Sequence, residues 1–269
     1  MRWYDPVPPR PALDRVLACS WRARPTGRHR LVPDACIDVL WLSTGDVWLC
    51  GPETSAWTFE LSFGVEATGV RFRPGVAPRL WGLDASALSN RRVHWRDVVG
   101  DSAERDLIAA ITAARPRGAD ARIEVLENAV AARVMVAGED GIDDIAEAVL
   151  ERLAADPHAR VSGLAAHCGL TERQLLRRCH VAFGYGVSTL ARIIRFHRFW
   201  STFALSTERT SLAGLAAEAG YTDQAHLVRD CRAITGLAPR QFLAEAYPTF
   251  PDMSDPYKTN GAFATTLMS

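Results

Sequence analysis

The strongest constraint on this chain of 269 residues is a repeat in its C-terminal half. The segment Leu164–Thr171 (LAAHCGLT) recurs 51 residues later as Leu215–Thr222 (LAAEAGYT). After one inserted residue, Ala225, the match continues at an offset of 52 and pairs Leu175 with Leu227, Leu176 with Val228, Arg177 with Arg229 and Cys179 with Cys231. Because a sequence repeat reflects one structural unit used twice, this half is expected to contain two similar units.

Each copy has the pattern of two helices joined by a tight turn. Gly169 and Gly220 stand where a helix must end with a positive φ, which glycine adopts at low cost. The predicted N-caps are Ser162 and Thr171 in the first copy, and Ser211 with Thr222 or Asp223 in the second. Thr171–Gln174 (TERQ) also fits the capping-box pattern. This arrangement is typical of a helix-turn-helix unit.

The second helix of each copy separates into a core face and an outer face. Leu175 and Cys179, and likewise Leu227 and Cys231, are four residues apart and are expected to face the core. The predicted base-reading side chains lie opposite and are Arg173, Leu176, Arg177, Gln224, Val228 and Arg229. Arginine fits guanine, glutamine fits adenine, and an aliphatic side chain fits the thymine methyl group. For each arginine, a solvated surface charge or a phosphate contact is the alternative.

Phosphate contacts are expected at the start of the same helices. The backbone N–H groups of Thr171 and Thr222 lie at helix N-termini, where anions bind. Arg178 and Arg232 are assigned to phosphate as well. The formal charge supports this location, because the overall zero is the sum of −4 over residues 1–157, +5 over 158–247 and −1 over 248–269. This modest excess predicts weak non-specific affinity and a dependence on base reading.

These residues resemble the AraC/XylS family of bacterial transcription regulators over Asp143–Tyr247. The resemblance rests on L-A-x-x-C-G-L-T, L-A-x-x-A-G-Y-T-D-Q-x-H-L-x-R and the closing Gly236–Phe242, with Arg195 at the place of a characteristic family arginine. The departures are Val187 for a usual proline, Cys179 and Cys231 for usual phenylalanines, and Ala238 for a usual serine.

The resemblance implies two helix-turn-helix units at the ends of a joining helix, here about Ser188–Phe203. Their second helices would enter successive major grooves and read bases through Arg173, Arg177, Gln224 and Arg229. The implied partners are double-stranded promoter DNA and RNA polymerase. Residues 1–115 more weakly resemble a β-rich sensor domain of such regulators through Val32–Leu40, Gly51-Pro52 and Gly69–Gly75, although that class usually has glycine where Ala35 stands.

The expected fold class is α+β, with a small β-rich N-terminal domain followed by an all-α DNA-binding domain in which a long helix joins two helix-turn-helix motifs. We expect a β-rich regulatory domain at 1–115, a helical connection at 116–141, the AraC-type domain at 142–247 and a flexible tail at 248–269. The predicted strands are Ala35–Leu42, Val47–Cys50, Trp57–Phe63 and Thr68–Phe72. Residues 1–33 are expected to be irregular apart from a helical turn near Leu13–Ala18.

Three helices are also expected, at Ser102–Ala113, Ala121–Ala137 and Asp143–Leu153. The apolar side chains of Ala121–Ala137 would serve either a dimer interface or the core. A homodimer is therefore one possible assembly.

The N-terminal part has the residues for an effector pocket. Trp41, Trp48, Trp57 and Trp81 would supply its walls, and Arg71 and Arg73, two apart on a strand, would clamp an anion. Asp34 and Asp38 could pair with these arginines. Asp34, Asp38, Arg71 and Arg73 are thus the candidate effector-binding residues, and the alternative is that tryptophans fill the core and Arg–Asp pairs fix loops.

Other function classes find no support in the sequence. No hydrolase, metalloprotease, P-loop or dinucleotide motif is present, so no catalytic residue, cofactor or metal site is assigned. An enzyme or a protein-interaction protein with a helical targeting domain is the alternative to a regulator. Six cysteines without a CxxC pair, no signal peptide and no apolar run of ~20 residues favour a cytoplasmic protein without a membrane partner.

Overall fold

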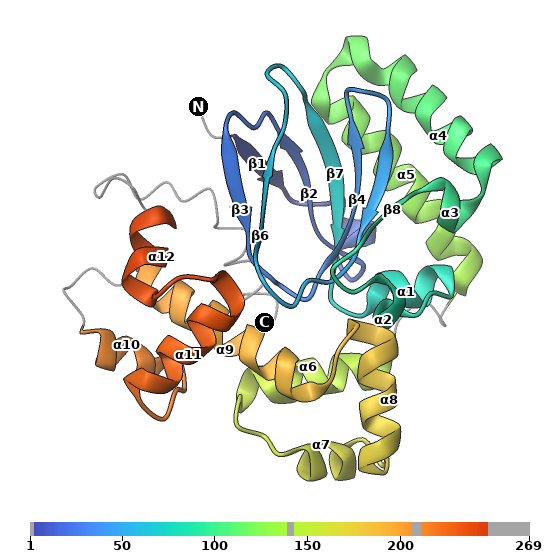
Figure 1. Ribbon diagram of the computed structural model, residues 1–269. Helices are drawn as coiled ribbons and strands as arrows, with labels where there is room; N and C mark the ends of the chain where they lie inside the picture. Colours follow the sequence, from blue (N-terminus) through green and yellow to red (C-terminus); the bar gives the residue numbers. More distant parts are fainter. Residues whose placement is uncertain (1–2, 139–142, 206–210, 247–269) are drawn as a thin grey trace.

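The computed structural model describes residues 3–138, 143–205 and 211–246 (Figure 1). A β-rich N-terminal part is followed by a helical C-terminal part, which confirms the α+β fold class. The expected tail at 248–269 and the end of the expected connection, residues 139–141, lie outside the described residues, as do residues 142, 206–210 and 247 of the expected AraC-type domain. In the described part of the chain, no helix combines the length and the apolar character needed to cross a membrane.

The N-terminal strands form two sheets. Their bounds are β1 Tyr4–Val7, β2 Leu17–Ala23, β3 Arg28–Leu31, β4 Ile37–Leu42, β5 Val47–Cys50, β6 Trp57–Glu60, β7 Ala67–Phe72 and β8 Arg92–His94. Six strands lie in the order β1-β2-β7-β4-β5-β8 with antiparallel pairing, and β3 and β6 form a second, two-stranded sheet. The two sheets face each other as an open barrel (Figure 1).

Two faces of the six-stranded sheet serve different purposes. Along β4, Ile37, Val39 and Trp41 are buried in the main core, whereas Asp38 and Leu40 point to the opposite face. This follows from the two-residue period of a strand. The outer face is therefore apolar and must be buried against other elements, whereas the inner face lines the barrel.

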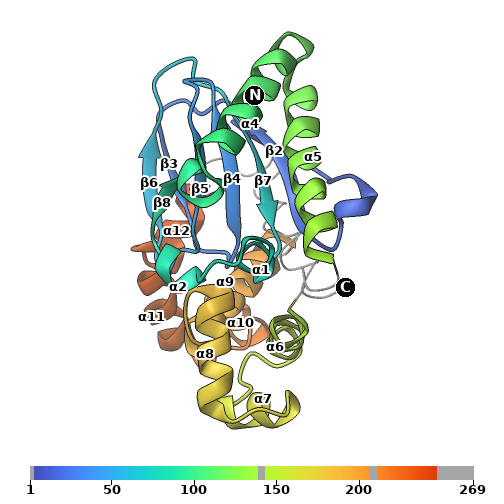
Figure 2. The ribbon, with the colours of Figure 1, turned by 90° about the vertical axis from the view of Figure 1, so that its right-hand side faces the viewer.

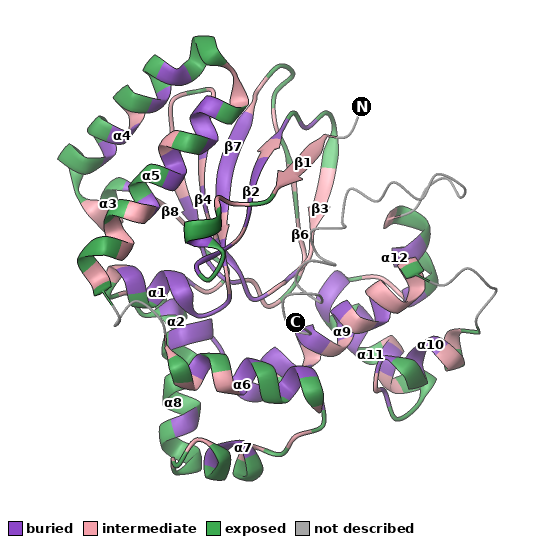
Figure 3. Cartoon of the chain, turned by 180° about the vertical axis from the view of Figure 1, so that it is seen from behind, coloured by how far each residue is buried: buried purple, intermediate pink, exposed green. Residues whose placement is uncertain are grey.

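Helices cover that outer face. The elements between β7 and the C-terminal part are α1 Val76–Trp81, α2 Ala85–Leu88, α3 Arg96–Val99, α4 Asp101–Ala114, η2 Arg115–Arg117 and α5 Ala119–Ala137. Leu126 and Val130 of α5 join Val70 and Phe72 of β7 in one core. Figure 2 shows α4 and α5 against the sheet, and Figure 3 shows α4 as largely exposed. The apolar side of α5, expected to serve either a core or a dimer, thus packs on the sheet.

The expectation that residues 1–33 are irregular is wrong. Residues 4–31 contain β1, β2, β3 and the short helix η1 Pro11–Leu13, so the helical turn also lies earlier than Leu13–Ala18. Pro6 fits into β1 because β1 is an edge strand. Five of the seven residues of β2 are buried, so both faces of the strand are largely covered. The sequence therefore lacks the alternation of polar and apolar residues that would predict a strand.

The C-terminal part contains two helix-turn-helix units. Its helices are α6 Asp144–Ala155, α7 Val161–His167, α8 Glu172–Phe183, α9 Val187–Leu205, α10 Leu212–Glu218, α11 Gln224–Thr235 and α12 Pro239–Ala246. The joining helix α9 extends slightly beyond the expected Ser188–Phe203. Its first half packs with α6, α7 and α8 in one core, and its second half packs with α10, α11 and α12 in another.

The predicted caps are mostly present. Thr171 accepts a hydrogen bond from the Gln174 N–H, and the Gln174 side chain accepts one from the Thr171 N–H, which completes the capping box. Ser211 caps α10, and Asp223 rather than Thr222 caps α11. The prediction for Ser162 is wrong, because Ser162 lies inside α7, whose N-cap is Arg160 without a side-chain bond.

Candidate functional site

The outer face of α8 is solvent-accessible at every residue predicted to read bases. Arg173 and Arg177 are exposed, and Leu176 retains 37% of its accessible surface. Leu175 and Cys179 are fully buried on the other side, as the helical period predicts. In Figure 1 the N-terminal end of α8 points away from the barrel. The first recognition helix thus presents two guanidinium groups and one apolar side chain on a single face.

The second recognition helix, α11, repeats this division. Leu227 and Cys231 are buried, Gln224 and Arg229 are exposed, and Val228 is half-buried. Its outer face therefore carries an amide, a guanidinium and a branched aliphatic group. These are side chains that can bond adenine, bond guanine and contact a thymine methyl group.

The four residues assigned to phosphate differ in their surroundings. The Thr171 N–H already donates to Gln174 Oε1 over 2.9 Å, so it is not free for an anion. Arg178 forms an ion pair with Asp143, with 3.2 Å between Nη1 and Oδ1. Thr222 Oγ1 lies 3.2 Å from His226 Nδ1, and Arg232 is exposed. The capping box and the Asp143 pair thus weaken the case for Thr171 and Arg178.

A cleft of about 650 Å³ lies beside α8. Its walls come from α1, from the end of α5 and from the face of α8 that carries Arg177 and Arg178. Arg79 and Arg133 line it as well, with Asp143 as its acidic residue. Arg133 Nε donates to the Leu80 carbonyl. Four guanidinium groups against one carboxylate make this the positive side of the first helix-turn-helix unit.

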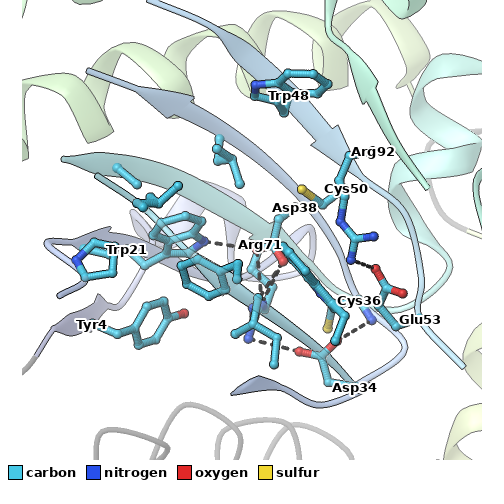
Figure 4. A pocket seen from close by; sticks show the side chains of 18 of the residues that line it. Tyr4, Trp21, Asp34, Cys36, Asp38, Trp48, Cys50, Glu53, Arg71 and Arg92 are labelled. Carbon is cyan, nitrogen blue, oxygen red and sulfur yellow. Dashed lines mark hydrogen bonds and ion pairs between the residues drawn. The ribbon is translucent and has the colours of Figure 1, made fainter. Parts of the chain in front are cut away.

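A second cavity, of about 300 Å³, lies inside the barrel between the six-stranded sheet and the β3–β6 sheet (Figure 4). Six aromatic side chains line it, namely Trp3, Tyr4, Trp21, Trp48, Trp57 and Phe59. Aliphatic side chains of β4, including Leu40, fill the wall between them. The cavity is therefore a mostly apolar pocket, of the kind that holds a small molecule.

Only two of the four tryptophans that were predicted to line a pocket do line this one. Trp48 and Trp57 line it, whereas Trp41 and Trp81 are on the helix-covered side of the sheet in the main core. The strand period gives the reason for Trp41, which lies an odd number of residues from Asp38 and shares the side of Val39. The alternation of side chains along the strand could have shown from the sequence alone that Trp41 and Asp38 face opposite sides. Trp3, Tyr4 and Trp21 were missed because their segment was not recognised as strands.

The polar end of the pocket is built around Arg71 (Figure 4). Arg71 Nη1 lies 3.0 Å from Asp34 Oδ2, and Arg71 Nε lies 3.1 Å from Asp38 Oδ1. Trp21 Nε1 donates to Asp38 Oδ1 over 3.0 Å. Burial raises the pKa of Asp38, while the charge of Arg71 opposes that rise. The expected pairing of Asp34 and Asp38 with an arginine is thus present at Arg71.

The expected clamp of Arg71 with Arg73 does not form. Arg73 lies past the end of β7, where its Nε donates to the Asp14 carbonyl over 2.6 Å, and it does not line the pocket. The two-residue period that would have put both arginines on one side stops at Phe72. Of these two arginines only Arg71 reaches the pocket, and its guanidinium is already bound by two carboxylates.

A second ion pair in the pocket was not predicted. Glu53, in the connection after β5, bonds Arg92 of β8, and the Arg92 guanidinium carbon lies 3.6 Å from the ring centre of Trp57. Burial raises the pKa of Glu53 to about 6, against the opposing charge of Arg92. A lone acidic residue in a loop gives no sequence signal, so only the fold reveals this pair.

The connection between β3 and β4, residues 32–36, touches both the pocket and the helical part. Val32, Asp34 and Cys36 line the pocket. Val32 also packs against the core of the second helix-turn-helix unit, and Ala35 and Cys36 belong to the core of the first. The Pro33 carbonyl accepts a hydrogen bond from His197 of α9 over 2.6 Å. One short segment therefore contacts the pocket and the cores of both helix-turn-helix units.

Two family models each match part of the chain. Residues 164–245 match a family described as a helix-turn-helix domain, and residues 5–94 match one described as a domain of unknown function. No curated protein sequence matches the chain.

Two crystal structures of ToxT from Vibrio cholerae are similar in shape. That of strain O395 is 10% identical, with 93% of this chain and 100% of that chain covered and a TM-score of 0.48. That of the wild-type protein of strain SCE256, with an unsaturated fatty acid bound, is 11% identical, with 88% and 97% covered and a TM-score of 0.48. The fatty acid is a ligand of that protein.

Proposed function

We propose that this chain is a DNA-binding transcription regulator of the AraC type and that a small molecule in its N-terminal pocket controls it; the helix-turn-helix match over residues 164–245 supports the DNA-binding part. In this proposal α8 and α11 enter successive major grooves of promoter DNA. The two cores on α9 hold both helices on one continuous support. A single chain can then read an asymmetric site.

The proposed base contacts are the exposed side chains of the two recognition helices, Arg173, Leu176, Arg177, Gln224, Val228 and Arg229. Thr222 and Arg232 are proposed to hold phosphates at the second unit. At the first unit, Thr171 and Arg178 can do so only after exchanging the partners described above.

A mobility-shift measurement with the DNA upstream of the protein's own gene tests these contacts. Arg177→Ala and Arg229→Ala should each lower specific affinity by about tenfold to a hundredfold, the loss expected for one bidentate guanine contact. Arg105→Ala removes an exposed arginine from α4 and should leave the affinity unchanged. Wild-type affinity and sequence preference in both recognition-helix variants would refute the assignment.

The proposed control of DNA binding by a ligand rests on residues 32–36, which contact both the pocket and the two helix-turn-helix cores. A ligand that moves Asp34 would move the neighbours that pack against both DNA-binding cores and against His197. Because packed interfaces have few intermediate arrangements, a small shift in the pocket can change how α8 and α11 are presented.

Two substitutions test this route in the full chain. Asp34→Asn weakens the pair with Arg71, and Leu40→Trp, a substitution outside the connection, fills the pocket that Val32, Asp34 and Cys36 line. Each should change operator affinity at least about threefold, whereas Glu60→Gln, on the exposed side of β6, should not. Thermal melting separates this effect from unfolding. Unchanged affinity in both folded variants would show that the pocket does not control DNA binding.

The remaining parts of the proposal concern partners and location. The helix-turn-helix family is one of regulators rather than enzymes, so we assign no reaction. We also propose that the protein contacts RNA polymerase, forms a homodimer and is located in the cytoplasm. Light scattering on the purified chain, with and without operator DNA, would distinguish a monomer from a dimer.

A further inference from the structure

The charges around the barrel pocket do not cancel. Its lining contains three carboxylates, Asp34, Asp38 and Glu53, and two guanidinium groups, Arg71 and Arg92. With all five ionised, the described residues of the lining carry one net negative charge. The excess lies at Arg71, because this one guanidinium is shared by Asp34 and Asp38, whereas Glu53 has Arg92 as its own partner.

The walls of the same pocket suit a cation. Ring faces carry negative electrostatic potential and attract ammonium and guanidinium groups, most strongly when water is excluded. The pocket already contains one such contact, between Arg92 and Trp57. Trp48 on the neighbouring strand β5 and Trp21 on β2 present further indole rings to the cavity.

We propose that this pocket selects a small hydrophobic cation, a quaternary ammonium or a protonated amine on an apolar body. The inference rests on the proposed function, because it names the chemical class of the regulator that would occupy the pocket. Such a ligand would neutralise the excess charge near Asp34 and Asp38 and place its apolar part among the aromatic rings. The volume of about 300 Å³ restricts it to a small molecule.

An anionic ligand fits this site less well. Arg71 is bound by both Asp34 and Asp38, and Arg92 is bound by Glu53. An incoming carboxylate would have to take a guanidinium from one of these partners and leave a buried carboxylate without its counter-charge, which is costly. It would also make the site more negative, with a net charge of −2 instead of −1.

Three probes that share a 3-phenylpropyl group separate charge from shape. They are trimethyl(3-phenylpropyl)ammonium, the alcohol 4-phenylbutan-1-ol and the anion 4-phenylbutyrate, measured with the full chain at pH 7.5 by calorimetry and tryptophan fluorescence. The ammonium should bind at least about tenfold more tightly than the alcohol, and the carboxylate more weakly than either.

Glu53→Gln tests the source of the preference. It retains an acceptor for Arg92 and changes the net charge of the lining from −1 to 0, so ammonium affinity should fall about tenfold and carboxylate affinity should rise. Glu60→Gln makes the same change outside the pocket and should alter neither affinity. Melting curves establish that both variants are folded.

The outcomes separate this inference from the proposed function. If the alcohol or the carboxylate binds best and Leu40→Trp abolishes its binding, the pocket remains a ligand site and the cation preference is refuted. A tenfold preference that persists in Glu53→Gln would also refute the assigned cause. If no probe binds at millimolar concentration, the regulatory pocket and the cation preference both fail.

Discussion

Arg195 of α9 donates a hydrogen bond from Nη2 to Oδ2 of Asp230 on α11, over 3.1 Å. Arg195 Nη1 also donates to the carbonyl of Pro157, between α6 and α7, over 3.0 Å. One guanidinium therefore bridges both helix-turn-helix units. Asp230 in turn lies 3.5 Å from Arg192 Nε and 3.5 Å from His226 Nε2. This network fixes the second recognition helix relative to the helix that joins the units.

Removing the carboxylate should therefore weaken both the fold and the spacing of the two units. We expect Asp230→Ala to lower the free energy of unfolding by about 3 kcal/mol, because Arg195 keeps its charge in a site where only 12% of the side chain is exposed. The variant should also discriminate less between operators with altered spacing of the two half-sites. Urea unfolding and mobility shifts on a spacing series measure the two effects.

A matched control lies on α10 of the same unit. Glu218→Ala also removes an acidic side chain, but from an exposed position, and should change the free energy of unfolding by less than about 0.5 kcal/mol. Equal losses for the two variants would mean that the network around Asp230 has no special role.

Ala35 lies between the pocket residues Asp34 and Cys36, packs in the core of the first helix-turn-helix unit and has a strained backbone. Its φ is +64°, in the left-handed region that costs a non-glycine residue about 1–2 kcal/mol, and its side chain is buried. We expect Ala35→Gly to change stability by less than about 1 kcal/mol, because relief of strain offsets lost packing and a more flexible unfolded chain. Ala35→Val should cost about 2 kcal/mol or more. Thermal unfolding of both variants tests this, and a harmless valine would contradict it.

Glu53 should make stability depend on pH in a direction opposite to that of most carboxylates. Its pKa rises from an ordinary 4.5 to about 6, mainly through burial, with Arg92 opposing and Asp34 adding to the rise. Between these pH values the folded state binds more protons than the unfolded state. The contribution of Glu53 to the free energy of unfolding is thus largest below pH 4.5 and is lost as pH rises through 6.

The free energy of unfolding of Glu53→Gln, relative to that of wild type, should therefore increase by about 2 kcal/mol as the pH rises from 4 to 7.5. Urea unfolding at several pH values measures this difference, and Glu60→Gln supplies the baseline. A difference that stays constant across the range would mean that the pKa of Glu53 is not raised.

Local patterns made the DNA-binding part predictable. The capping box at Thr171, the glycine at 169 and the four-residue spacing of Leu175 and Cys179 each act within one or two helical turns, and all three are present. Arg178 shows the limit of such reasoning. Its exposed position on the helix could be predicted, but its ion pair with Asp143, 35 residues earlier, depends on how α6 packs.

The pocket was less predictable because its residues come from distant strands. Trp21 reaches Asp38 from β2, which looked irregular because strong burial on both faces removes the alternation of polar and apolar residues. Arg73 was misplaced because β7 ends one residue before it. Glu53 gave no signal at all, since only the pairing of β5 with β8 brings Arg92 to it. Strand ends and strand partners, rather than residue types, limited the prediction.

Gly184 marks the place where α8 contacts the N-terminal domain. Its carbonyl accepts a hydrogen bond from Ser89 Oγ over 2.8 Å, and a Cβ atom at this position would lie 2.9 Å from the Ala85 carbonyl oxygen and also overlap Ser89 and Pro52. Gly184→Ala should therefore separate α8 from α2, lower the free energy of unfolding by about 2 kcal/mol or more, and change operator affinity.

Gly169→Ala is the matched control for this substitution. Gly169 has a φ of +65°, against +82° for Gly184, but a Cβ atom there would meet nothing within 4 Å. It should show only the backbone cost of about 1–2 kcal/mol. Chemical unfolding and mobility shifts on the two variants isolate the domain contact, because backbone strain is common to both. If the two variants lose the same stability and bind operator alike, the docking of α8 on the N-terminal domain contributes neither to the fold nor to control of DNA binding.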